Sequence, residues 1–276
     1  MDLNTVEEVV RPWARADVPT GPGDAWLAGG SWLFSEPQPH LRRLFDLQAY
    51  GWTPLEADED GLTVAATCTV AALERWSGAL PEWHAATAIA PCCRSLVGSF
   101  KVWNVATVGG NICLALPAGP MTALMAALDG SCLIWRPDGS EWTVAALDIV
   151  MGERRTVLEH GDVLRSIRLP ARTLMRKAAV RQISLSPLGR SGALLVGTRE
   201  LAGGPVALTV TGSTIRPVRC AIEAPLGRDD LARRLDAVIP SSLWHDDVHG
   251  RPDWRRHVTT VLAGELLAEL FGAAAA

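Results

Sequence analysis

The sequence predicts an α+β protein built from short strands and separate helices. Two hairpin signals support this class, because strand-like runs flank turn residues 58–61 and again residues 137–139. A run rich in Ala, Leu and Met, residues 119–129, favours a helix between other elements. Beyond residue 170, three strand-like runs precede two helical segments. With 276 residues, 48% of them hydrophobic, the chain is long enough to bury a substantial core.

The elements before residue 100 are assigned from apolar runs and their boundaries. Short apolar runs bounded by Gly, Pro or Asp are typical of strands, and Ser31 is a suitable N-cap for a helix. The expected elements, in order, are a strand at 24–28, a short helix from Ser31 to Phe34, strands at 41–47, 54–57 and 62–66, and helices at 69–76 and 81–96.

The elements after residue 118 follow from the same signals. Pro170 ends a strand, and the Gly-Gly-Pro sequence at 203–205 marks a turn between strands. The expected elements, in order, are a helix at 119–129, strands at 132–136, 141–144, 163–169, 178–184, 192–198 and 206–211, and helices at 229–238 and 254–271.

A domain boundary is expected near residue 171, where mixed strands and helices give way to an antiparallel sheet with two helices. Residues 1–171 would form one domain in two lobes, about 1–53 and 54–171. Residues 172–276 would form a smaller α+β domain, with helices and an antiparallel sheet of three or more strands. The sequence contains no low-complexity linker and no periodic repeat.

Charge, hydropathy and cysteine spacing argue against several classes of protein. A net charge of −4 offers no basic field for nucleic acid or an anionic membrane. No apolar run approaches the ~18 residues of a membrane span. The first eight residues are acidic and do not form a signal peptide, which favours a cytoplasmic location. The six cysteines form no C-x₂-C pair, so we expect no metal or iron–sulfur site on this chain.

Two similar glycine turns are the main functional signal. Residues 27–33 and 106–112 each contain an apolar run, a Gly-Gly pair, a polar residue and further apolar residues. A Gly-Gly pair between a strand and a helix lets backbone approach a ligand, and the following N–H groups suit a phosphate. One such turn is ordinary connectivity. Two in one domain suit a long diphosphate such as FAD, although neither a P-loop nor a dinucleotide fingerprint is present.

Other candidate residues have simpler structural interpretations. His245 and His249 are spaced like metal ligands, but we expect a loop there and no metal. Cys113 follows the second turn and is expected to be a free thiol rather than a covalent flavin attachment. The Arg-Arg pairs at 42–43 and 154–155 are expected at the surface, with phosphate binding as the alternative. No Ser/His/Asp set has sensible spacing, and no catalytic residue is assigned.

Several segments together resemble the FAD-binding medium subunit of molybdenum hydroxylases, the xanthine dehydrogenase and carbon monoxide dehydrogenase family. In order along nearly the whole chain they are AGGSWL (28–33), GSFKVWNVATVGGNI (98–112), LPAG (116–119), GDVLRSIRLP (161–170), TIRPVR (214–219), DDVHG (246–250) and WRRH (254–257). The resemblance implies a two-lobed FAD-binding domain of the vanillyl-alcohol-oxidase/PCMH type followed by a smaller α+β domain.

The resemblance also implies which residues bind the cofactor. Both glycine turns would wrap the FAD pyrophosphate, Asn111 would hydrogen-bond the cofactor, and Leu164 would contact the flavin end. Arg181, or its neighbour Gln182, falls loosely at a basic position of the family. The implied FAD-binding residues are Leu27, Ala28, Gly29, Gly30, Ser31, Trp32, Leu33, Thr107, Val108, Gly109, Gly110, Asn111, Leu164 and Arg181.

The chain departs from the family pattern at several of these places. Ser31 replaces a usual Thr, Trp32 and Trp103 stand where Asp and Arg are common, and Leu116 and Pro120 replace Ser and Asp. The loss of the Asp at position 120 puts one polar cofactor contact in doubt.

The resemblance implies electron transfer within a larger complex. Electrons from a molybdopterin subunit would pass through iron–sulfur clusters of a second subunit to non-covalently bound FAD on this chain, and then to NAD or another acceptor. Side chains would supply position and electrostatics while the flavin carries out the redox chemistry. The alternatives are a self-sufficient FAD-dependent reductase or oxidase of the same fold, and a non-catalytic assembly subunit with weakened FAD binding.

Overall fold

The computed structural model describes residues 4–272. Its first lobe is a three-stranded parallel sheet in the order β1-β3-β2, followed by the 3₁₀ helix η1. The bounds are β1 Glu8–Val10, β2 Asp24–Leu27, β3 Arg43–Asp46 and η1 Leu47–Tyr50. The expected helix after Ser31 is absent, and residues 31–36 form successive turns. The N–H of Phe34 donates to Gly30 O and that of Ser35 to Trp32 O, so the segment closes turns without the run of consecutive i→i−4 bonds of an α-helix. Pro37 disfavours helical backbone at the residue before it, so the segment does not continue as a helix.

The second lobe is an antiparallel sheet in the order β4-β5-β10-β6-β7. Both expected hairpins are confirmed, as β4–β5 and β6–β7, and β10 pairs with one strand of each. The bounds are β4 Leu55–Asp58, β5 Gly61–Ala65, β6 Ser131–Trp135, β7 Glu141–Ala145 and β10 Val163–Pro170. A small hairpin that we did not expect, β8 Val150–Gly152 and β9 Arg155–Thr156, precedes β10.

Six helical segments lie between β5 and β6 in the chain, and α4 contacts β5 and β10 of this sheet. They are α1 Val70–Glu74, η2 His84–Ala88, α2 Ile89–Arg94, α3 Phe100–Val105, α4 Val108–Leu114 and α5 Pro120–Ala127. The single helix expected over 81–96 is wrong, because the segment divides into η2 and α2. Pro91 lacks an N–H and is tolerated only in the first turn of an α-helix, so α2 begins two residues before it.

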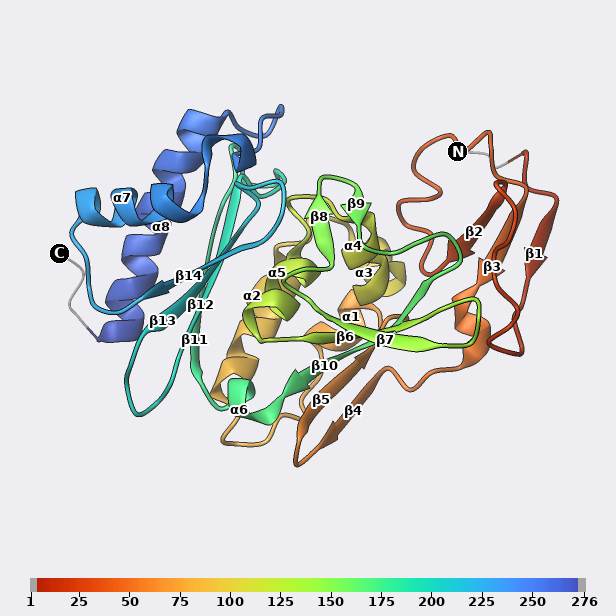
Figure 1. Cartoon of the computed structure of the whole chain (residues 1–276), viewed down its shortest axis with the longest axis horizontal. Coiled ribbons are helices and arrows are strands. Elements are labelled where there is room, and N and C mark those ends of the chain that lie inside the picture. Colours follow the sequence, from red (N-terminus) through yellow and green to blue (C-terminus); the bar gives the residue numbers. More distant parts are fainter. Residues whose placement is uncertain (1–3, 273–276) are drawn as a thin grey trace.

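A four-stranded antiparallel sheet, β11-β12-β13-β14, forms the C-terminal part. The strands are β11 Lys177–Ile183, β12 Ala193–Arg199, β13 Val206–Thr211 and β14 Val218–Ile222, and the helices are α6 Ala171–Leu174, α7 Arg228–Val238, η3 Ser241–Leu243 and α8 Pro252–Phe271. Four strands agree with the expected sheet of three or more, although no strand was assigned at the position of β14. Figure 1 shows α7 and α8 on the outer face of this sheet and α2 and α5 on the inner face.

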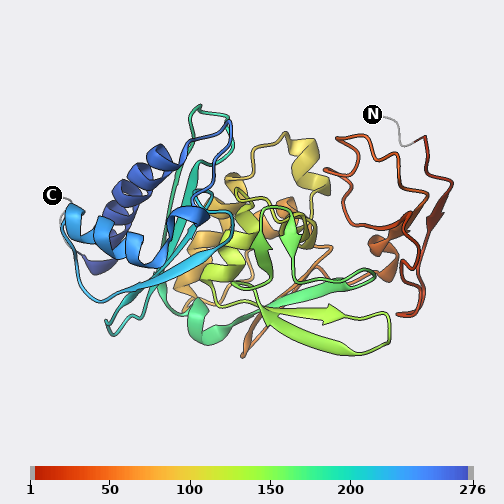
Figure 2. The same ribbon diagram turned by 45° about the horizontal axis from the view of Figure 1, so that its top comes forward.

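The two faces of β12 belong to different parts of the core. Leu194 and Val196 pack into the core of the second lobe, while Ala193 and Leu195 pack beneath α8. This follows from the alternation of side chains along a strand. Figure 2 shows the same order from a second direction, with the β1–β3 sheet and α8 at opposite ends of the molecule. The boundary near residue 171 remains a prediction.

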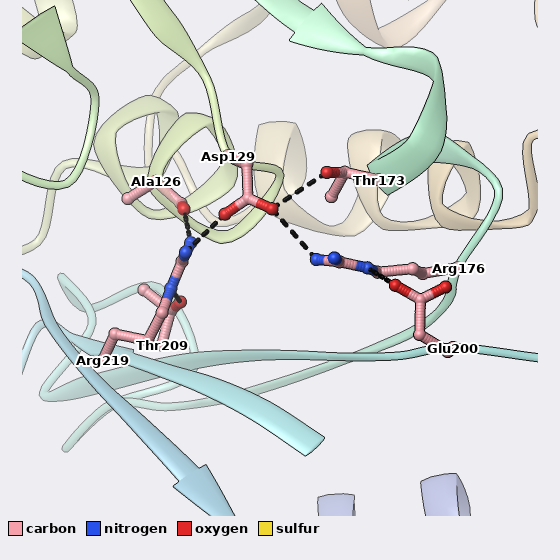
Figure 3. Close-up of polar contacts among 7 residues, drawn as sticks. All are labelled: Ala126, Asp129, Thr173, Arg176, Glu200, Thr209 and Arg219. Carbon is pink, nitrogen blue, oxygen red and sulfur yellow. Dashed lines mark hydrogen bonds and ion pairs between the residues drawn. The ribbon is translucent and has the colours of Figure 1, made fainter. Parts of the chain in front are cut away.

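Asp129 joins the C-terminal sheet to the rest of the chain. It follows α5 at φ +54°, and its carboxylate accepts hydrogen bonds from Arg176 and Thr173, each at 2.9 Å, and from Arg219 of β14. Arg219 also donates to the carbonyl of Ala126. Figure 3 shows the carboxylate between these partners. The charged groups lie at the junction, so they fix how β14 sits against α5.

An aromatic cluster joins the two lobes beside the start of β10. Tyr50 and Trp52 stack with ring centroids 5.0 Å apart, and Trp135 of β6 packs edge-on against both. The Arg165 guanidinium lies 4.4 Å from the Trp52 ring centroid. Such pairs contribute packing energy beyond the area they bury, which accounts for part of the high tryptophan content.

Within residues 4–272, no helix is both long and apolar enough to cross a membrane.

Candidate functional site

A cavity of about 440 Å³ lies where the first lobe, the second lobe and the C-terminal sheet meet. Four segments supply most of its walls: the loop after β2, the segment around α4, the start of β10, and the end of the β11–β12 connection. The lining residues of these segments include Leu27, Ala28, Gly29, Gly30, Ser31, Trp32, Leu33, Thr107, Gly109, Gly110, Asn111, Cys113, Leu116, Ala118, Gly119, Asp162, Leu164, Arg190 and Ser191. Most are apolar or glycine, as is typical of a cofactor site.

The loop after β2 offers unpaired backbone donors. Within residues 4–272, no protein acceptor is in hydrogen-bond range of the N–H groups of residues 29–33, whereas Phe34 donates to Gly30 at 2.8 Å. Buried or ligand-facing N–H groups seek an acceptor. Five consecutive free donors at a cavity wall therefore form a cradle suited to anionic oxygens such as those of a diphosphate.

The second glycine turn has a different construction, because the N–H groups that we expected to suit a phosphate donate to protein acceptors. The N–H of Val108 donates to Cys68 O at 2.8 Å, that of Gly109 to Ala66 O at 2.9 Å, and that of Gly110 to Thr107 Oγ1 at 3.0 Å. Thr107 is the N-cap of α4. The first turn of this helix is therefore already satisfied by protein, and its contribution to the cavity is close approach rather than donors.

Glycine is required in both turns for different reasons. A Cβ on Gly29 would lie 1.6 Å from the carbonyl oxygen of Val105, and one on Gly109 would lie 2.4 Å from the Ala66 side chain. Gly30 has φ +66°, a conformation that other residues rarely adopt. At Gly110 a Cβ would approach Thr107 Oγ1 at 2.8 Å and Ala28 at 3.8 Å, so it would enter the space between the two turns.

Asn111 holds the next wall segment in place. Its Oδ1 accepts a hydrogen bond at 3.0 Å from the N–H of Met121, in the first turn of α5. Among the described residues its side-chain NH₂ group has no acceptor, and the residue lines the cavity. Asn111 can therefore donate to a ligand while its oxygen fixes α5.

All but two of the predicted FAD-binding residues line the cavity. Val108 is fully buried in the core beneath it. Arg181 lies outside the cavity and pairs with Glu265 at 3.3 Å and Glu269 at 2.6 Å, both on α8. Sequence reasoning missed Arg190 and Ser191, because no local pattern shows that the β11–β12 connection reaches the first lobe. The expected neighbour Gln182 donates to Ser191 Oγ at 2.8 Å and thus supports this wall indirectly.

Two arginine side chains make cation–π contacts with Trp32, one of the residues that depart from the family pattern. The guanidinium groups of Arg154 and Arg190 lie 5.3 and 5.7 Å from its ring centroid. Arg154 occupies the tight turn between β8 and β9 with φ +55°, and its N–H donates to Ala115 at 2.9 Å. Positive charge from two distant segments therefore converges beside the loop of unpaired donors, which favours an anionic ligand there.

Cys113 is the exposed cysteine, and the other five are buried. Desolvation by the surrounding protein raises the pKa of the Cys113 thiol to about 12. A thiol of this kind is a poor nucleophile near neutral pH. This favours a free thiol over a covalent flavin linkage.

The two spaced histidines do not converge. His245 is buried with its Nε2 3.2 Å from the Asp247 carboxylate, while the backbone N–H of His249 donates to the same carboxylate at 2.8 Å. Among residues 4–272, no three His, Cys, Asp or Glu side chains are grouped as metal ligands.

A family model described as the FAD binding domain in molybdopterin dehydrogenase matches residues 20–172. The chain belongs to this family. The matched range contains the donor loop, the second glycine turn and β10, which are three of the four walls. The donor cradle and the mainly apolar walls fit FAD, whose diphosphate is anionic and whose flat ring system has apolar faces and an apolar dimethylbenzene end.

Similar proteins support the same assignment. The glyceraldehyde dehydrogenase medium chain of Sulfolobus acidocaldarius is 26% identical over 185 residues, 63% of this chain and 64% of the relative. The match therefore spans less than two thirds of that relative.

Solved structures of related proteins share the fold over nearly their whole length. Carbon monoxide dehydrogenase from Oligotropha carboxidovorans matches with TM-score 0.81 and 19% identity, over 99% of this chain and 100% of that chain. Quinoline 2-oxidoreductase from Pseudomonas putida 86 matches with TM-score 0.79 and 18% identity, over 99% of both chains. The fold class predicted from the sequence is thereby confirmed.

Proposed function

We propose that this chain is the FAD-carrying electron-transfer subunit of a molybdenum hydroxylase. The observation that carries the proposal is the cavity itself, in which free backbone donors face apolar walls. Bound FAD supplies the redox chemistry. The protein's residues bind and orient the cofactor and exclude water from it.

Different walls of the cavity supply different contacts to FAD. The N–H groups of the loop at 29–33 donate hydrogen bonds to the anionic diphosphate, and the guanidinium groups of Arg190 and Arg154 lie beside this loop. The Asn111 amide donates a directional hydrogen bond, and Leu164 at the start of β10 gives an apolar surface. We favour electron transfer over a self-sufficient oxidase or reductase because the matching family model is the FAD binding domain in molybdopterin dehydrogenase.

The partners belong to the same proposal. We infer a complex with an iron–sulfur subunit and a molybdopterin subunit, with NAD or another molecule as the electron acceptor. The relatives named above include a chain called a medium chain and structures of carbon monoxide dehydrogenase, which favours a multi-subunit setting.

The test begins with FAD titration of the purified chain, followed by flavin fluorescence and the visible spectrum. We expect about one FAD per chain, released into the supernatant by acid precipitation. A colourless protein that never takes up FAD supports the assembly-subunit alternative, and colour that stays in the pellet contradicts non-covalent binding.

Co-expression with the genes beside its own tests the partners. We expect a complex that contains iron and molybdenum on size exclusion and metal analysis. A lone chain that oxidises a small substrate without either metal favours the self-sufficient flavoenzyme instead.

A further inference from the structure

Arg255 of α8 is a buried cation with an unusual set of partners. Its side chain is 1% exposed, and it donates to the carbonyl oxygens of Gly250 at 2.8 Å, Gly192 at 2.6 Å and Gly212, while pairing with the Asp247 carboxylate. Burying a guanidinium is costly unless its donors are used. Here Nε and both terminal nitrogens are used, three times on backbone carbonyls, so the side chain fixes main-chain positions.

Two of these carbonyls adjoin the cavity. Gly192 directly follows Ser191, which lines the wall contributed by the C-terminal sheet. Gly212, after β13, donates its N–H to Pro117 O at 2.8 Å, and Pro117 lies between the lining residues Leu116 and Ala118. One guanidinium therefore connects two walls that are far apart in the sequence.

A third connection runs through the carboxylate. Asp247 lies 3.2 Å from His245 Nε2, and His245 Nδ1 lies 4.0 Å from the Glu153 carboxylate. Glu153 directly precedes Arg154, whose guanidinium lies over the Trp32 ring. The partners of Arg255 thus lead to the β8–β9 turn at the edge of the same cavity.

We propose that Arg255 is a positioning residue for the cofactor site, which holds the Ser191 wall and the 116–118 wall at the spacing that FAD requires. The inference rests on the proposed function only for the identity of the ligand. Packing of α8 alone does not need this charge, because its leucines already bury the helix against β11 and β12.

The test compares Arg255→Met and Arg255→Lys with Arg256→Met in the full chain. Arg256 is the adjacent residue on α8, but it is half exposed and pairs with Asp236 across to α7. Three properties are measured for each protein: FAD affinity by flavin fluorescence, thermal unfolding without FAD, and the rate at which a maleimide modifies Cys113 at alkaline pH. Cys113 faces the cavity, so its rate reports the walls without any cofactor.

We expect Arg255→Lys to weaken FAD binding about tenfold or more, as is typical when a supporting contact of a binding site is lost, and to change the Cys113 rate. Arg256→Met should leave both unchanged. If Arg255→Met does not fold, Arg255→Lys carries the test, because it keeps the charge. A variant with lower thermal stability but wild-type FAD affinity and Cys113 rate would show a purely structural role and overturn the inference. If the wild-type protein does not bind FAD, the proposed function is overturned. The rate at which maleimide modifies Cys113 in the variants would then still show whether Arg255 positions the walls of the cavity.

Discussion

The backbone of Gly29 lies directly against the carbonyl group of Val105, so that an added Cβ would be 1.6 Å from the Val105 oxygen. Val105 ends α3, immediately before the second glycine turn. The loop after β2 and the segment that leads into α4 are therefore packed backbone to backbone. This contact explains why two similar turns occur so far apart in the sequence: each forms one side of the same cavity, and glycine lets them meet.

Gly29→Ala is expected to separate the two turns. The methyl group cannot share space with the Val105 carbonyl, so the loop must shift and its N–H groups lose their common direction. Overpacking of this kind typically costs about 1–3 kcal/mol of stability. We expect a lower unfolding temperature and weak FAD binding. Gly227→Ala is the matched control, since a Cβ there meets nothing within 4 Å, and normal FAD binding by Gly29→Ala would refute the close contact.

Gly110→Val is expected to abolish or severely weaken FAD binding while the fold without FAD persists. The reason is the space between the turns, since Gly110 does not have a positive φ. A branched side chain would extend toward Ala28 and displace the Thr107 hydroxyl from the N–H that it caps. Flavin content after purification and circular dichroism of the protein without FAD measure the two effects. A variant that copurifies with normal flavin would leave the second turn as a simple connection.

Asp129→Asn is expected to loosen the C-terminal sheet. Burial raises the pKa of Asp129, but Arg219, Thr173 and Arg176 together bring it below its ordinary value, so the carboxylate is charged at neutral pH. Among residues 4–272, the amide leaves Arg219 without a charged partner and leaves Arg176 paired with Glu200 alone, which typically costs about 1–3 kcal/mol. Asp230→Asn, which breaks the exposed pair with Arg233, should change unfolding by less than about 0.5 kcal/mol. Equal effects of the two variants in chemical unfolding would contradict a role at the junction.

Asp24 gives a prediction about pH. Hydrogen bonds from Arg43, with smaller contributions from the N–H groups of Gly21 and Thr20, lower the pKa of the buried carboxylate from 3.8 to about 2. Because the folded pKa lies below the unfolded one, this stabilisation is complete above pH 3.8 and is lost as the pH falls toward 2.

Asp24→Asn should therefore unfold at a lower temperature than wild type at neutral pH. The difference should stay constant down to about pH 4 and shrink below it, because only the wild type then loses its charge. A difference that disappears already near pH 6 would mean that another group is responsible.

Local patterns in the sequence were sufficient for elements whose partners are close along the chain. Both hairpins and helices α7 and α8 are where turn residues and apolar runs predict them, because the stabilising contacts lie within a few residues. The helix expected after Ser31 and the unbroken helix over 81–96 were wrong. The first segment closes only turns before Pro37, and the second divides ahead of Pro91, which lacks an N–H. The two glycine turns were also recognisable, since their composition is unusual and their motifs resemble a known family.

Only the tertiary structure decided how the two turns differ and what completes the cavity. In the second turn the N–H groups of Val108 and Gly109 donate to the carbonyl oxygens of Cys68 and Ala66. The loop at 29–33 is therefore the main source of free donors. Arg190 and Ser191 reach the same cavity because β12 packs the C-terminal sheet against α5. Hydrogen-bond partners and cavity walls that come from segments more than 40 residues apart have no signature in local sequence, because they depend on how the sheets pack.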